Sequence, residues 1–71
     1  MEAYKNTDKA SNIEAYEIGP DYIKIKYTTN SISTYSYDKA GRNHVELLKN
    51  LAQSGSGVKR YIHKYLKGLS D

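Results

Sequence analysis

Residues 58–69 read VKRYIHKYLKGL, and this stretch decides how the C-terminal part of the chain packs. Its apolar side chains recur at the i, i+3, i+4, i+7, i+8 and i+11 positions, which form one stripe along an α-helix. The stripe predicts a helix from about Val58 to Lys67, stopped by Gly68. We expect Ile62, Tyr65 and Leu66 to be buried against a core. The positions between them are cationic and are expected to face solvent: Lys59, Arg60, His63, Lys64 and Lys67.

A second helix precedes this one. Val45, Leu48, Leu51 and Ala52 follow a helical period, which predicts a helix over roughly residues 40–53. Asn43 followed by Glu46 has the spacing of a capping box, so the helix could also begin later than residue 40. The Ser-Gly-Ser-Gly run at residues 54–57 ends the helix, with Gly55 suited to the position just after it.

Three strands are expected ahead of the helices. Residues 22–28 alternate strictly, so Ile23, Ile25 and Tyr27 are predicted to face the core and the lysines between them to face water. Residues 13–18 form a shorter strand with a break in its alternation, and residues 32–37 form the third. Asn30 is the candidate for a positive φ in the turn before the third strand.

Together these segments predict an α+β fold of the order βββαα. Short connections favour a three-stranded antiparallel meander, with both helices packed on one face of the sheet. Residues 1–10 are polar and without periodicity, and are expected to be a flexible N-terminal arm. Residues 11–71 form the single domain. A chain of 71 residues buries only about 60% of its unfolded surface, so a net stability of a few kcal/mol is expected.

The amino-acid composition argues against several kinds of site and several classes of protein. The chain has no cysteine and only two histidines, so neither a disulfide nor a metal site is expected. It has eight tyrosines but no Phe or Trp, so tyrosine must fill the large core positions. No apolar run approaches the roughly 18 residues of a membrane span, and the N-terminus lacks the pattern of a signal peptide. A cytoplasmic protein is therefore expected.

Charge is segregated along the chain. Residues 1–38 hold four basic and six acidic side chains, whereas residues 39–71 hold seven basic and two acidic ones. A one-sided positive field is typical of proteins that bind polyanions. The alternative is an ordinary solvated helix surface, and in so small a domain the two interpretations have similar weight.

The order and spacing of several short elements resemble the KTSC domain family. They are Ser11-Asn12-Ile13, the alternating Ile23, Ile25 and Tyr27, a central Tyr35-Ser36-Tyr37, Leu47-Leu48 before Ser54-Gly55, and Ile62 in the closing helix. The family is similar in length and occurs in bacterial and phage proteins and at the C-terminus of some lysyl-tRNA synthetases. The resemblance implies the same α+β fold, and RNA binding has been suggested for the family.

Two sets of residues are candidates for nucleic-acid binding. Tyr35 and Tyr37 share one face of the third strand, and exposed rings at that spacing would stack on unpaired bases. We favour the alternative that both rings lie in the core, which needs large side chains. The second set supplies phosphate contacts and consists of Arg42, Lys59, Arg60, Lys64 and Lys67. The backbone N–H groups of residues 55–57 are candidates to assist it.

Catalysis is not expected, because no nucleophile elbow and no pair of carboxylates in apolar surroundings is present. No cofactor is expected either. The leading hypothesis is a small non-enzymatic module that binds RNA or another nucleic acid. The main alternative is an adaptor that docks on an acidic protein partner or pairs through a sheet edge. A third hypothesis, an amphipathic helix lying on anionic lipid, conflicts with the predicted burial of its apolar stripe.

Overall fold

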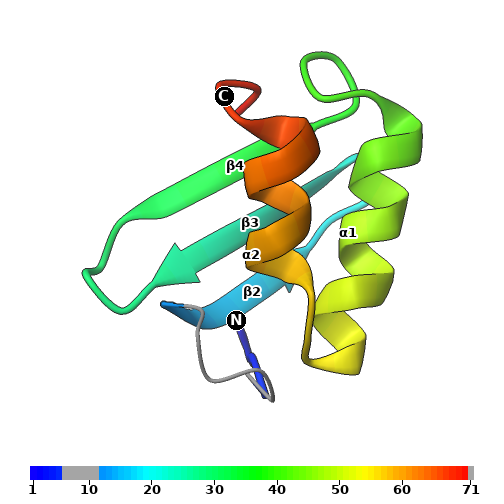
Figure 1. The fold of residues 1–71 in the computed structure, drawn as a ribbon. Helices are drawn as coiled ribbons and strands as arrows, with labels where there is room; N and C mark the ends of the chain where they lie inside the picture. The colour runs from blue at the N-terminus through cyan, green and yellow to red at the C-terminus, as the bar shows by residue number, and fades with distance from the viewer. Residues whose placement is uncertain (6–11, 71) are drawn as a thin grey trace.

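The computed structural model describes residues 1–5 and 12–70 of the chain. The elements follow in the order β1 (Glu2–Ala3), β2 (Ile13–Ile18), β3 (Tyr22–Tyr27), β4 (Ile32–Ser36), α1 (Arg42–Ser54), α2 (Val58–Tyr61) and η1 (Ile62–Leu66). The last two are consecutive, and we call residues 58–66 the closing helix. Its second half, η1, is π-helical. Figure 1 shows the closing helix and α1 side by side over one face of the sheet.

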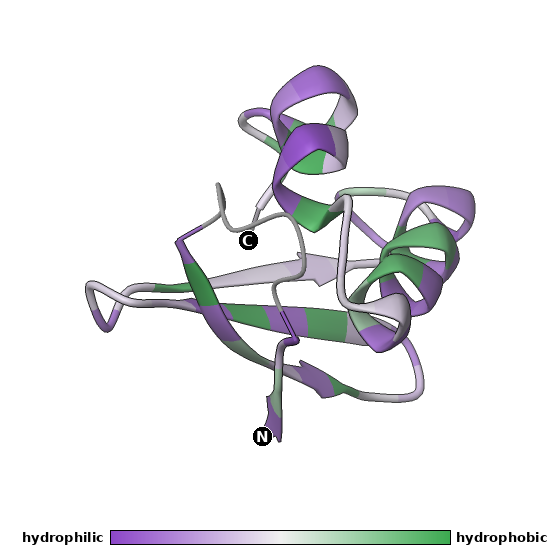
Figure 2. Ribbon diagram, turned by 60° about the horizontal axis from the view of Figure 1, so that its bottom comes forward, coloured by the Kyte–Doolittle hydropathy of each residue, from purple (hydrophilic) through white to green (hydrophobic). Residues whose placement is uncertain are grey.

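The sheet is antiparallel, with the strand order β1-β2-β3-β4. The predicted α+β class and the meander of three strands are confirmed, since β2, β3 and β4 pair in sequence order. The fourth strand, β1, was not predicted. Hydrophobic and hydrophilic positions alternate along β3 (Figure 2), and Ile23 and Ile25 are fully buried, as their alternation predicts.

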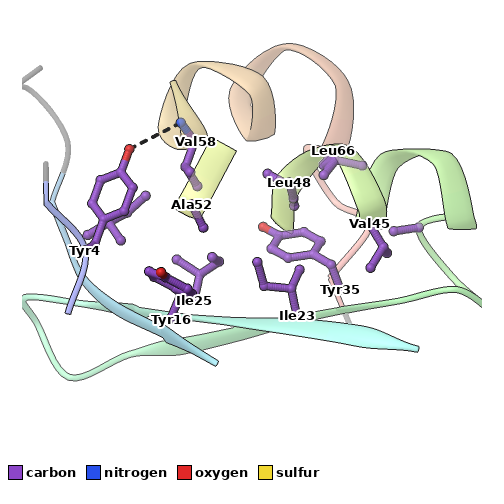
Figure 3. Packing of buried hydrophobic residues seen from close by; sticks show 12 residues of the cluster. Tyr4, Tyr16, Ile23, Ile25, Tyr35, Val45, Leu48, Ala52, Val58 and Leu66 are labelled. Carbon is purple, nitrogen blue, oxygen red and sulfur yellow. Dashed lines mark hydrogen bonds between the residues drawn. The ribbon is translucent and has the colours of Figure 1, made fainter. Parts of the chain in front are cut away.

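The sequence predicts a flexible arm over residues 1–10, but its first residues belong to the sheet. Glu2 pairs with Tyr16, and the Tyr4 N–H donates to the Glu14 carbonyl at 3.0 Å. Tyr4 is only 6% exposed, and its hydroxyl accepts the Val58 N–H at 3.5 Å (Figure 3). The large aromatic side chain of Tyr4 therefore anchors this segment. Because its neighbours in the sequence are polar, the sequence pattern does not indicate that role. Residues 6–10 of the expected arm lie outside the described residues.

The break in alternation along residues 13–18 is a β-bulge. The pairing of β2 with β3 shifts between Ile13 and Ala15. The extra residue lets Ile13 and Tyr16 both reach the core, although they lie three positions apart and would face opposite sides of a regular strand. In the turn between β3 and β4, Asn30 has the predicted positive φ, at 70°.

The core lies between the sheet and the two helices (Figure 3). Each of the two helices contributes an apolar stripe, and the inward faces of the strands contribute isoleucine and tyrosine. The buried hydrophobic residues are Tyr4, Ile13, Tyr16, Ile23, Ile25, Tyr35, Ala40, Val45, Leu48, Ala52, Val58 and Leu66. Tyrosine occupies three of these positions, as expected of a chain without Phe or Trp.

Helix α1 begins and ends at glycines. Gly41 is its N-cap residue and no side chain caps the helix, so the capping box predicted from Asn43 and Glu46 is wrong. Glu46 instead accepts hydrogen bonds from Tyr37 and Lys49 on the same carboxylate oxygen. Gly55 ends the helix in the left-handed conformation, as predicted, and its N–H donates to the carbonyls of Leu51 and Ala52.

Candidate nucleic-acid interface

The closing helix docks by one side and exposes the other. Val58 and Leu66 are fully buried and Ile62 packs against the core, which confirms most of the predicted stripe. All five predicted cationic positions are exposed: Lys59, Arg60, His63, Lys64 and Lys67. Hydrophilic positions cover the outward side of this helix in Figure 2. The cationic face is therefore available to a partner in solution.

Tyr65 departs from the prediction, because it is 50% exposed rather than buried. The reason is the π-helical geometry of residues 62–66. Bonds from i to i+5 widen the turn, so each residue advances less around the axis than in an α-helix. Residues four apart then lie in rows: Val58, Ile62 and Leu66 face the core, while Tyr61 and Tyr65 lie together on the flank.

An aromatic cluster forms on this flank from two helices. The ring centroids of Tyr61 and Tyr65 are 4.8 Å apart, and His44 of α1 lies 5.7 and 6.1 Å from them. His44 Nδ1 is 2.6 Å from the Tyr61 hydroxyl. Burial, followed by the nearby Tyr65, raises the pKa of Tyr61. Ring packing and a hydrogen bond thus tie α1 to the closing helix and hold the half-exposed Tyr65 against a fixed support.

Cations flank the cluster. A surface hollow of about 280 Å³ lies between α1 and the closing helix, and it is lined by Leu51, Gly57, Arg60, Tyr61, Lys64 and Tyr65. The Lys64 Nζ lies 5.3 Å from the centroid of the Tyr65 ring. We call Arg60, Lys64, Tyr61 and Tyr65 the aromatic–cationic flank. It offers one ring face and two positive charges within a single hollow.

The charges of the flank are not neutralised within the described part of the chain. The ion pairs found there join Lys26 to Glu14 at 3.0 Å and Lys49 to Glu46 at 2.8 Å, both away from the closing helix. Arg60 and Lys64 have no carboxylate within ion-pairing distance among these residues, and the same holds for Lys67. The flank therefore keeps its positive potential, whereas the sheet lysine Lys26 is paired.

The predicted stacking pair, Tyr35 and Tyr37, does not form an exposed platform. Tyr35 is 3% exposed, and burial, followed by its contact with Tyr27, raises the pKa of Tyr35 to about 12. Tyr37 is half-buried and donates its hydroxyl to Glu46 at 2.5 Å. The core alternative that we favoured is confirmed for Tyr35, whereas Tyr37 is only partly buried against the core. Among the described tyrosines, the exposed one is Tyr65.

Arg42 is exposed at the start of α1 but does not join the flank. Its charge helps to lower the pKa of Glu46, and it offsets part of the rise in the pKa of Tyr37. The larger causes lie elsewhere, since the hydrogen bond from Lys49 lowers the pKa of Glu46 most and the hydrogen bond to Glu46 raises the pKa of Tyr37. Arg42 therefore belongs to a local network of side chains that includes the carboxylate of Glu46.

The loop before the closing helix offers fewer backbone donors than predicted. The Gly55 N–H is buried and used within the cap of α1, so it is not available to a phosphate. The neighbouring Val58 N–H is also buried and donates to Tyr4. A phosphate contact from the N–H groups of Ser56 and Gly57 stays a prediction.

The remaining two predicted residues, Lys59 and Lys67, lie on the other side of the closing helix. With His63 they line a second hollow, of about 290 Å³, between this helix and the sheet. The structure thus divides the predicted cationic face into two rows. The residues that the sequence did not single out for binding are Tyr61, Tyr65 and His44, although the i, i+4 spacing of the two tyrosines was visible.

Comparisons with known proteins do not indicate a function for this chain, so the functional proposal rests on the geometry. No protein-family model, no curated protein and no solved structure matches this chain. Within the described residues, no group of His, Cys, Asp or Glu side chains could hold a metal ion. In the same part of the chain, none of the helices has the length and apolar character needed to cross a bilayer.

Proposed function

We propose that this chain is a small, non-enzymatic, cytoplasmic module that binds single-stranded RNA through the aromatic–cationic flank. The observation that carries the proposal is a half-exposed Tyr65 ring in one hollow with Arg60 and Lys64. Single-strand binders combine aromatic rings, on which bases stack, with cations that follow the backbone. The flank has both components.

The geometry suggests separate roles for the aromatic ring and the two cations. A base would stack on Tyr65, whose inner side rests on Tyr61 and His44. Arg60 and Lys64 would each contact a phosphate beside that base. One stacked base contributes about 1–3 kcal/mol, and the phosphate contacts contribute a part that weakens with salt. Such a site is tolerant of sequence, because every base has a stacking face.

The resemblance to the KTSC domain family supports the same proposal, since RNA binding has been suggested for that family. Membership of this chain in the family is itself a proposal. It rests on the order and spacing of the short elements from Ser11 to Ile62.

The test is the affinity of the protein for a labelled oligouridylate, measured by fluorescence anisotropy at low salt. Tyr65→Ala should weaken binding by about 5- to 150-fold, the factor equivalent to one stacked base. Tyr65→Phe keeps the ring and should bind within about twofold of the parent protein. Equal affinities for Tyr65→Ala and the parent, with both folded by circular dichroism, would refute stacking at this position.

A protein partner remains the second candidate, and one observation favours it. Strand β4 lies at the edge of the sheet, and its Ile32 is 54% exposed. An extended segment of an acidic protein partner could add to this edge by main-chain hydrogen bonds. Ile32→Lys would weaken such a complex and leave oligouridylate affinity no lower than before. A loss of RNA binding in this variant would place the interface on β4 instead of the flank.

A further inference from the structure

The hollow between the closing helix and the sheet is separate from the flank and has its own chemistry. Its floor is formed by Tyr27, Tyr35, Ile62 and Leu66. Its rim is formed by Lys59, His63, Lys67 and Gly68. The first three rim residues are spaced four apart along the closing helix, so they stand in one row that overlooks the hollow.

The rim of this hollow carries positive charge from Lys59 and Lys67. Its floor is apolar, apart from the hydroxyl groups of Tyr27 and Tyr35. Among the described residues that line it, two are lysines, one is a histidine and none is an aspartate or glutamate. The Tyr35 phenol is buried and in contact with Tyr27. Burial is the main cause that raises its pKa to about 12, and the phenol hydrogen-bonds to Tyr27 and Ser33. Tyr35 therefore shapes the floor, and the contacts to an anion come from the rim.

We propose that this hollow binds a phosphomonoester group carried by a nucleoside. A phosphomonoester bears a charge of about −1.5 to −2 at pH 7 and has three acceptor oxygens, which suits a rim with the two lysines Lys59 and Lys67. The apolar floor suits the attached sugar or base. A phosphodiester inside a strand has a charged neighbour on each side and fits an apolar floor less well. The volume, about 290 Å³, is at the small end of ligand sites, which favours a single nucleotide.

Two sources present this group: a free nucleoside monophosphate, and the phosphorylated 5′ end of a nucleic-acid strand. The second source rests on the proposed function, because the strand would then continue toward Arg60 and Tyr65 on the same helix. The first does not rest on it. The binding of free nucleotides and the binding of strand ends can therefore be refuted independently of each other.

The first arm titrates uridine monophosphate into the ¹⁵N-labelled protein and follows the amide NMR spectrum, with uridine as the control ligand. We expect saturable shifts at His63, Lys67 and Gly68 with the monophosphate alone. Lys67→Ala should weaken this binding at least about tenfold, the factor of one charge-assisted hydrogen bond. Lys39→Ala is the matched control, since it removes an exposed lysine of the turn before α1, outside both hollows, and should bind within about twofold of the parent protein. Equal shifts with uridine and its monophosphate, or no saturable shifts at these residues, would overturn the proposal.

The second arm compares a 5′-phosphorylated oligouridylate with its 5′-hydroxyl counterpart. Tighter binding of the phosphorylated strand by about tenfold, lost in Lys67→Ala, would support the hollow and assign strand ends as the source. Equal binding of the two strands, together with saturable binding of the monophosphate, would support the hollow and assign free nucleotides. If the monophosphate does not bind and the two strands bind equally, the hollow is not a phosphate site, whatever the flank does.

Discussion

The double variant Arg60→Gln, Lys64→Gln should reduce the salt dependence of RNA binding by an amount that the structure sets. Each cation that neutralises one phosphate of a single strand contributes roughly 0.7 to the slope of log affinity against log salt. Arg60 and Lys64 are the two cations of the flank and have no carboxylate partner among the described residues, so the parent protein should show a slope of about −1.4. Removing both charges should leave a slope of about zero.

The difference is large enough to measure. Raising monovalent salt fourfold, from about 50 to about 200 mM, should weaken the parent protein roughly 7-fold but leave the affinity of the double variant about the same. The assay is anisotropy of a labelled oligouridylate across four or five salt concentrations. All substituted positions lie on exposed parts of the closing helix, so the fold should be unaffected.

A matched control has the same net charge with the substitutions elsewhere. Lys24→Gln, Lys39→Gln removes one lysine of β3 and one exposed lysine of the turn before α1. Its slope should stay near that of the parent. If both double variants show the same reduced slope, binding depends on total charge only, and the assignment of phosphate contacts to the flank is wrong.

Three further predictions concern the fold. Leu66→Ala removes a fully buried side chain and should lower the free energy of unfolding by about 2–5 kcal/mol in urea titrations. Gly55→Ala puts a Cβ at φ +88° and 2.6 Å from the Cβ of Lys5, so it should lower the melting temperature by several degrees. The pKa of Glu46 is lowered, so the stability that its contacts give is present above the ordinary glutamate pKa and is lost as pH falls through the shifted value. Tyr37→Phe should move the carboxyl titration, followed by ¹³C NMR, back toward the ordinary range.

Much of the fold follows from local patterns. Strict alternation located β3, and the apolar periods located α1 and the closing helix to within about two residues. The positive φ of Asn30 and the left-handed Gly55 followed from the conformational freedom of these residue types. These features depend on near neighbours in the sequence, which is why a single chain reveals them.

The missed features depend on contacts between distant segments. Strand β1 is two residues long and has no period of its own, and its neighbour Tyr4 finds a partner in Val58, 54 positions away. The predicted stripe assumed an α-helix throughout the closing helix, so the π-helical half moved Tyr65 from the core to the flank. Exposure was predicted correctly for the cations of the closing helix, whereas aromatic residues were sought at Tyr35, which is buried, and Tyr37, which is partly buried. A binding role for these residues stays a prediction.

The most direct test of the flank as an RNA-binding surface is an amide NMR titration with unphosphorylated oligouridylate, which keeps the second hollow out of the measurement. We predict shifts that gather on Arg60, Tyr61, Lys64 and Tyr65 and on His44 of α1. Shifts confined to β4, or a spectrum unchanged at saturating RNA, would contradict the account.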